Sequence, residues 1–241
     1  MSDAPKVLIT GGAKRIGSAL CTAFAHHGWH VIIHTVQSVD AARALAQRLG
    51  HNVSIARADL SYPMQVDAFA KNIAAQHGHI HCLINNASIF EPDTNDESLI
   101  ARMMMVNALA PKMLMDYFSA IQKKITVINL LDYGLTNPQK KFSYYYGSKA
   151  LLQFYTHQAQ AFWGDAARVY GIAPGPTLPS PRQSSAHFQQ LCAHTSHKRA
   201  TRLSEVTEAA LLCTRGDIRS GHIFWLDGRE DAETRPVIDR C

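Results

Sequence analysis

The chain has 241 residues, a formal net charge of +5, 46% hydrophobic residues and 18% charged residues. This length and composition are typical of one globular domain and exclude a disordered chain, and no apolar run approaches the roughly 20 residues of a membrane-spanning helix. The five cysteines are scattered and form no CxxC pair, which favours reduced thiols over disulfides or a zinc site.

Short apolar runs rich in β-branched residues alternate with longer helical patterns along the whole chain. The expected strands are 6–10, 30–35, 53–57, 81–85, 125–130, 167–172 and 222–226, and the expected helices are 15–27, 39–49, 64–77, 97–121, 143–163 and 204–214. Such an alternation is typical of βαβ crossovers, in which helices cover both faces of a parallel sheet. The sequence therefore predicts an α/β fold with a doubly wound parallel sheet of about seven strands, as a single domain over residues 1–241.

The first expected strand runs directly into a glycine-rich turn, TGGAKRIG, and then into a helix. Glycines permit a tight turn and a close helix, and the exposed amides at a helix N-terminus bind a pyrophosphate. This context predicts a dinucleotide site; a purely structural turn is the alternative. The turn residues expected at the cofactor are Gly11, Lys14, Arg15, Ile16 and Gly17.

The end of the second expected strand bears on which nicotinamide cofactor binds. NAD-selective sites usually have a carboxylate there, which holds the ribose 2′-hydroxyl. This strand instead ends in HTVQS, and the first acid is Asp40. Lys14 and Arg15 can meet a 2′-phosphate and Ser38 lies beside it, so we expect NADP(H), although Gln37 stands where an arginine would strengthen the case.

Polar residues also follow the third and fourth expected strands. Asp59 and Leu60 follow the third, and Asn86 and Ala87 follow the fourth. At the carboxyl edge of a parallel sheet such residues can contact the adenine half of a dinucleotide, and simple turn formation is the alternative.

Two other binding classes are not expected. The histidines of 77–81 straddle a helix end and a strand start without an acidic or thiol ligand, so a solvated turn is favoured over a metal site. The basic residues are dispersed, and their densest cluster, 198–202, is short, so no nucleic-acid surface is expected. The first residues show no apolar signal core, and we expect a cytoplasmic protein.

Tyr145 and Lys149 are four residues apart on one expected helix and therefore share a face. An ammonium group beside a phenol favours the phenolate, so Lys149 is expected to lower the pKa of Tyr145 from about 10. The pair predicts a proton donor for a reductase.

Residues 174–202 form the least regular stretch and follow the sixth expected strand. This position is typical of a substrate lid, and a plain surface loop is the alternative. The residues after 229, which include Arg235 and Arg240, are a tail that could reach a neighbouring subunit.

Together these motifs resemble the short-chain dehydrogenase/reductase family over essentially the whole chain. The resemblance implies a Rossmann-type fold, a role for Asn107 beside a proton-relay water, and Pro174 and Gly175 beside the nicotinamide. It also implies a homotetramer, with the fifth and sixth helix regions at the interfaces.

One position departs from the family pattern. Where the family has a serine before the tyrosine, this chain has Asp132. An ionised carboxylate only accepts hydrogen bonds and would repel a developing alkoxide, which favours a C=N bond in a nitrogen heterocycle over a ketone. Asp132 could instead cap a turn while Thr136 or Ser143 replaces the serine.

With an aspartate in this position, the chain resembles the pteridine reductase branch of the family, which includes dihydromonapterin reductases. That resemblance implies that Arg15, Ser88, Phe90, Asp132 and Tyr145 contact the pterin substrate. Phe90 would stack on the ring; core packing is its alternative role.

The expected activity is therefore NADPH-dependent reduction of a dihydropteridine of the dihydromonapterin or dihydrobiopterin type, with Asp132, Tyr145, Lys149 and Asn107 as catalytic residues. A carbonyl or 3-oxoacyl reductase and a non-catalytic NADP sensor are the alternatives.

Overall fold

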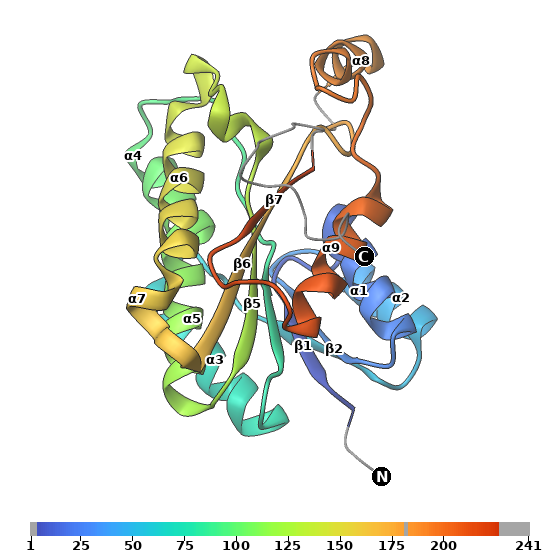
Figure 1. Ribbon diagram of the computed structural model, residues 1–241, viewed down its shortest axis with the longest axis vertical. Coiled ribbons are helices and arrows are strands. Elements are labelled where there is room, and N and C mark those ends of the chain that lie inside the picture. The colour runs from blue at the N-terminus through green and yellow to red at the C-terminus, as the bar shows by residue number, and fades with distance from the viewer. Residues whose placement is uncertain (1–3, 181–182, 227–241) are drawn as a thin grey trace.

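The computed structural model describes residues 4–180 and 183–226 of the chain. Its seven strands form one parallel sheet in the order β3-β2-β1-β4-β5-β6-β7 (Figure 1). The strands are β1 (Lys6–Ile9), β2 (His30–Thr35), β3 (Val53–Arg57), β4 (Cys82–Asn85), β5 (Ile125–Leu130), β6 (Ala167–Pro174) and β7 (Ile223–Leu226). The predicted doubly wound α/β fold is confirmed.

Helices cover both faces of the sheet (Figure 1). One face carries α1 (Arg15–His26), α2 (Val39–Leu49) and α9 (Leu203–Arg215). The other carries α3 (Pro63–His77), α4 (Glu97–Met104), α5 (Ala110–Ile121), α6 (Ser143–His157) and α7 (Ala159–Trp163). A further helix, α8 (Ser185–Ala193), lies beyond the carboxyl ends of the strands.

Alternation along each strand divides the core into two clusters. In β1, Val7 and Ile9 pack against the α1 side, while Leu8 packs against the α3 side. All three are fully buried, because side chains of successive strand residues point to opposite faces and both faces are covered. The near-continuous apolar strands of the sequence follow from this arrangement.

The sheet order reverses direction between β1 and β4. The chain first runs outward from β1 to β3, and β4 then pairs with the other side of β1. At such a switch point the carboxyl ends of the two central strands diverge into a crevice. Thr10 marks the junction, because its amide donates to the Ile84 carbonyl at 3.0 Å.

The prediction of a single helix over 97–121 is wrong in one detail, because a π-helical turn, Met105–Leu109, separates α4 from α5. Pro111 explains the interruption: it has no amide hydrogen to donate to the carbonyl of Asn107, four residues earlier. The Ala110 amide instead donates to the Met105 carbonyl, five residues back.

Two other expectations need correction. The helix expected over 143–163 is divided at Gln158 into α6 and α7. The segment 174–202 is less irregular than expected, because it contains α8, whose first turn Ser184 caps by accepting a hydrogen bond from the His187 amide.

The C-terminal tail with Arg235 and Arg240 lies outside the described residues. Within 4–180 and 183–226, no helix combines the length and the apolarity that crossing a membrane requires.

Candidate active site

The glycine turn after β1 brings helix α1 unusually close to the end of β4. Gly11 has a φ of +62°, in the left-handed region that glycine adopts without strain. A side chain at Gly17 would place its Cβ 2.8 Å from Asn86 Nδ2 and 2.9 Å from Gly12 Cα, so only glycine fits. The turn therefore presents backbone amides at the N-terminus of α1, as an anion-binding loop does.

His34 fixes this turn from the neighbouring strand. Its Nδ1 accepts a hydrogen bond from the Gly11 amide at 3.1 Å, and its Nε2 lies 3.0 Å from the Ala58 carbonyl. Burial lowers the pKa of His34 to about 4, so the ring is neutral at pH 7 and carries its hydrogen on Nε2. The sequence interpretation missed this residue, whose only signal was a polar side chain in an apolar strand.

Asn86 supports the turn rather than lining the cofactor pocket. Its Nδ2 donates to the carbonyls of Thr10 and Gly11 at 2.9 and 3.0 Å. Thr10 Oγ1 in turn accepts from the amides of Asn86 and Ala87. The turn-forming alternative is thus realised for the Asn86 side chain, whose amide joins β4 to the glycine turn.

A pocket of 330 Å³ lies over the carboxyl ends of β1 to β4. Six of the predicted cofactor residues line it: Gly11, Lys14, Ser38, Asp59, Leu60 and Ala87. Arg15, Ile16 and Gly17 are absent from its lining, and Ser88, expected at the substrate, lies here instead. Two residues that the sequence interpretation missed, His34 and Arg102, also line the pocket.

Charge in this pocket is mainly positive. Lys14 and Arg102 are exposed, and neither side chain has a hydrogen-bond partner among the described residues. Asp59 is the acid of the lining, and its Oδ1 already accepts from the amide and hydroxyl of Ser61. Turn formation, the alternative role of Asp59, is thus realised, and the free cations fit a phosphate-bearing ligand.

The chemical centre lies where α6 crosses the end of β5. The hydroxyl of Tyr145 donates to Asp132 Oδ2 at 2.7 Å, and the Gly134 amide donates to Asp132 Oδ1, also at 2.7 Å. Lys149 Nζ donates to the Leu130 carbonyl at 2.7 Å and lies 6.0 Å from the centroid of the Tyr145 ring. The structure therefore brings Asp132, Tyr145 and Lys149 together.

The prediction that Lys149 lowers the pKa of Tyr145 is wrong for this structure. Burial first, and the Asp132 carboxyl second, raise the pKa of Tyr145 well above its usual value. Burial also raises the pKa of Asp132 and lowers that of Lys149 to about 8. Tyr145 is thus held protonated at neutral pH, with its hydrogen directed at the carboxyl group.

The alternatives for the serine position are decided by geometry. Ser143 Oγ donates to Asp93 Oδ2 and Thr136 Oγ1 donates to the Tyr133 carbonyl, so both hydroxyls are directed elsewhere. Asp132 does cap the turn Tyr133–Thr136, but with Oδ1 only. Its second oxygen remains available for Tyr145.

Asn107 lies in the π-helical turn and is fully buried. Its side chain exchanges hydrogen bonds with the backbone of Ile89, accepting from the amide at 2.7 Å and donating to the carbonyl at 2.8 Å. It also donates to Ser148 Oγ at 3.0 Å. Asn107 therefore ties the segment after β4 to the helix that carries Tyr145 and Lys149.

A second, larger cavity of 970 Å³ opens beside this centre. Its described lining is Arg15, Phe90, Pro92, Gln139, Lys141, Phe142, Ser180, Gln183, Ser184, His187 and Leu191. The ring of Phe90 stacks on Phe142 with centroids 4.5 Å apart and meets the Tyr145 ring edge-on at 4.6 Å. Phe90 is 48% exposed, which excludes the core-packing role.

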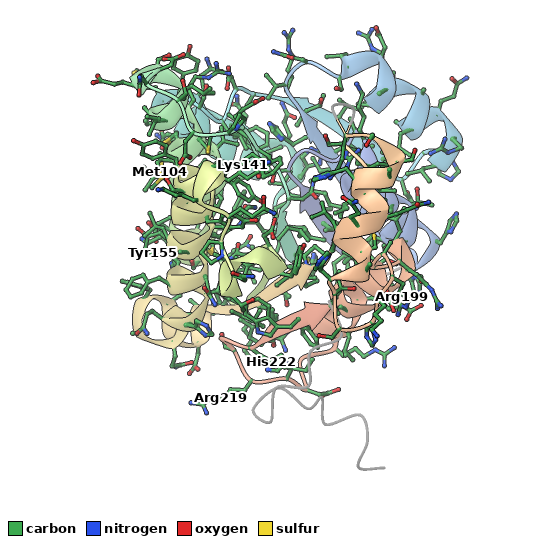
Figure 2. The ribbon with its side chains drawn as sticks, turned by 90° about the horizontal axis from the view of Figure 1, so that it is seen from above. Met104, Lys141, Tyr155, Arg199, Arg219 and His222 are labelled. Atoms are coloured by element: carbon green, nitrogen blue, oxygen red, sulfur yellow. The ribbon has the colours of Figure 1, made fainter. Side chains whose placement is uncertain are left out.

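Arg15 connects the glycine turn with the segment that follows β6. Its guanidinium donates to the carbonyls of Leu178 and Pro179 at 2.9 Å each. Pro174 and Gly175 are buried at the start of this segment, where β6 ends. Arg15 and Phe90 thus line the larger cavity, while six of the predicted cofactor residues and Ser88 line the smaller one. The other predicted site residues, Asp132, Tyr145, Lys149, Pro174 and Gly175 among them, line neither; Figure 2 views this sheet edge from above.

Comparisons with known proteins agree with this arrangement. Dihydromonapterin reductase of Escherichia coli (strain SMS-3-5 / SECEC) is 26% identical over 230 residues, which cover 92% of this chain and 95% of that protein. (+)-Borneol dehydrogenase 1 of Salvia officinalis is 32% identical over 105 residues, or 42% of this chain, and the match spans only 40% of that protein's length.

Among solved structures, FolM Alternative dihydrofolate reductase 1 from Brucella canis, complexed with NADP, superposes with a TM-score of 0.87. It is 32% identical, and the match covers 93% of this chain and 92% of that one. A family model described as short chain dehydrogenase matches residues 5–190. By this match and by the shared architecture, the chain belongs to the short-chain dehydrogenase family of oxidoreductases.

Proposed function

We propose that the chain reduces a dihydropteridine to its tetrahydro form with NADPH. The observation that carries the proposal is the hydrogen bond from Tyr145 to Asp132, which puts a carboxyl group where a serine hydroxyl would serve a ketone. A carboxyl group can accept from ring N–H groups or pass on a proton, whereas it opposes charge on a developing alkoxide. A C=N bond of a pteridine suits both properties.

NADP(H) is the cofactor that the smaller pocket fits. The first turn of α1 offers backbone amides to the pyrophosphate, and the exposed side chains of Lys14 and Arg102 offer positive charge in a pocket without an acid at the end of β2. NADPH supplies the hydride when bound. The Brucella canis relative solved with NADP supports this assignment.

The protein's own groups then handle the proton and the ring. Tyr145, protonated at neutral pH, turns its hydroxyl hydrogen from Asp132 to the ring nitrogen and donates it there, and Asp132 holds the pterin edge. Lys149, fixed by the Leu130 carbonyl, adds positive charge. Phe90 covers one face of the ring, and Asn107 keeps α6 in register with the end of β4.

The larger cavity bears on the substituent of the pterin. Its titratable lining residues are Arg15, Lys141 and His187, and no acid lines it among the described residues. This favours a substrate with an anionic side chain, such as dihydrofolate, as a second candidate beside the neutral dihydromonapterin. The segment 174–202 would act as the lid, since Gln183, Ser184, His187 and Leu191 line the cavity.

A substrate panel tests the proposal. NADPH oxidation is measured with dihydromonapterin, dihydrobiopterin, dihydrofolate, a 3-oxoacyl thioester and simple ketones, and then with NADH in place of NADPH. We expect turnover of the dihydropteridines that Tyr145→Phe lowers by at least about a hundredfold. Turnover of the ketones or the thioester alone would establish the carbonyl reductase instead, and tight NADPH binding without any turnover would establish the sensor.

The homotetramer is also part of the proposal. Helices α6 and α7 present exposed aromatic side chains, among them Phe154 and Phe162 at 50% and 47% exposure, as a surface that another copy could cover. The cytoplasmic location stays a prediction of the sequence.

A further inference from the structure

The turn that follows Asp132 is packed closely against helix α6. Gly134 is buried in the 3₁₀ turn Tyr133–Thr136. A Cβ added to Gly134 would lie 2.7 Å from Tyr146 Cε1 and 2.8 Å from its Cζ. Because non-bonded carbons approach to about 3.5 Å, a methyl group at position 134 would force the Tyr146 ring or the turn to move.

The two consecutive tyrosines of α6 therefore both restrain Asp132, Tyr145 directly and Tyr146 through Gly134. Tyr145 donates its hydroxyl hydrogen to Oδ2, and Tyr146 packs on the residue whose amide donates to Oδ1. The rings of Tyr145 and Tyr146 meet edge-on, with centroids 5.2 Å apart and an interplanar angle of 66°.

We propose that Gly134 and Tyr146 are positioning residues, which orient the Asp132 carboxyl group so that Oδ2 faces the Tyr145 hydroxyl. Neither residue needs to touch substrate. The inference rests on the proposed function only in that Asp132 takes part in the reduction, and it concerns the geometry of the carboxyl group whatever the substrate is.

The physical reason is that one hydrogen bond leaves a carboxyl group free to turn about its Cβ–Cγ bond. The second bond, from the Gly134 amide, fixes the carboxyl plane and favours the charged form of Asp132. Displacing the turn would therefore misalign Oδ2 and raise the pKa of Asp132. The titratable groups facing Asp132 are Tyr145, Tyr146 and Lys149 from α6, and Tyr133 of the same turn acts on Tyr146.

Gly134→Ala tests the inference, and Gly147→Ala is its matched control. Gly147 lies on α6 next to Tyr146, and a Cβ there would meet no atom within 4 Å. For Gly134→Ala we expect kcat to fall about tenfold, the acidic limb of the pH profile of kcat/KM to move to higher pH, and KM for NADPH to stay within about twofold. Gly147→Ala should change none of these.

A pair of Tyr146 variants separates packing from chemistry. Tyr146→Phe keeps the ring and should retain most of the activity. Tyr146→Ala removes the group that the new methyl would strike, so the double variant Gly134→Ala/Tyr146→Ala should be no worse than Tyr146→Ala alone. Additive losses would contradict the packing argument.

The pKa of Asp132, followed by NMR of carboxyl-labelled aspartate and assigned with Asp132→Asn, provides a readout that needs no turnover. We expect it to be higher in Gly134→Ala than in Gly147→Ala. A folded Gly134→Ala with unchanged Asp132 titration would overturn the inference, while leaving the proposed function intact. Conversely, a chain that reduces no dihydropteridine but shows the shift would overturn only the proposed function.

Discussion

Lys14 and Arg102 approach the smaller pocket from different elements, one from the glycine turn and one from α4. Arg102 lies four residues before Val106, which lines the same pocket, so the two share a helix face. The Arg102 guanidinium also contributes to lowering the pKa of Asp59, after the hydrogen bonds from Ser61. Arg102 thus adds a positive charge that the end of β2, with Gln37, does not provide.

We predict that Lys14→Ala and Arg102→Ala each raise KM for NADPH about tenfold, because each removes a charge-assisted contact with phosphate. KM for NADH should change less, and the difference should shrink at high salt. Steady-state kinetics with both cofactors checks this, with Arg43→Ala on α2, outside the pocket, as the control. Equal losses with NADH would mean that the two cations do not act on the 2′-phosphate.

For single residues, the sequence predicts those roles that depend on local spacing along the chain. Tyr145 and Lys149 share a helix face, and Asp132 follows a strand end, so short-range patterns suffice for all three. The roles of His34 and Gly134 depend on contacts between separate segments, such as the bond from His34 to the Gly11 amide. The direction of the Tyr145 pKa shift was missed for the same reason, since burial and the Asp132 contact are tertiary properties.

Among the elements, α9 is joined at its start to the end of the lid segment. Glu205 accepts hydrogen bonds from the Arg202 amide at 2.7 Å and from Arg199 Nη1 at 2.9 Å. The Arg199 hydrogen bonds contribute most to lowering the pKa of Glu205, to about 2. Glu205 thus caps α9 and holds the residues that lead into it.

We predict that Glu205→Gln lowers the free energy of unfolding by about 1 kcal/mol at pH 7, a typical capping contribution. Since the folded-state pKa is depressed, the contribution is complete above the unfolded value of about 4.3 and disappears as pH falls towards 2. Urea unfolding followed by circular dichroism from pH 7 downwards measures this window. Glu208→Gln, an exposed neighbour on α9, serves as the control, and an equal effect of both substitutions would refute the capping role.

Element boundaries were predictable where caps and breakers lie in the local sequence. Pro111 was such a signal for the π-helical turn, since its missing amide disturbs the helix four residues earlier. Helix α8 was not foreseeable from periodicity, because most of its residues are exposed and a helix without a buried stripe has no apolar repeat to detect.

Helices α5, α6 and α7 together carry an aromatic cluster, which consists of Tyr155, Phe162 and Trp163 around Lys112. Lys112 Nζ lies 5.6, 5.4 and 5.4 Å from the three ring centroids, and Trp163 Nε1 donates to Asp116 at 2.9 Å. Tyr155 lies on the opposite side of the molecule from Arg199 (Figure 2). None of the residues of the aromatic cluster lines either pocket.

We predict that Phe154→Asp combined with Phe162→Asp converts the proposed tetramer to smaller species, because charges would be placed on the surface that a second copy is proposed to cover. Sedimentation velocity of the purified chain gives the mass directly. Met64→Asp, on α3 at 87% exposure, is the control and should leave assembly unchanged. An unmodified chain that sediments as a monomer would exclude the tetramer.

Arg15 lines the larger cavity and directly follows Lys14, which lines the smaller pocket. Its backbone, with a φ of +54°, opens α1 directly after the glycine turn, while its guanidinium forms part of the wall of the larger cavity. We expect a ligand that moves this residue in one pocket to alter the other, in which case the affinities for the two ligands are linked by a common factor, the same in either order of addition. An affinity measured for one ligand alone is consequently that of the half-filled enzyme.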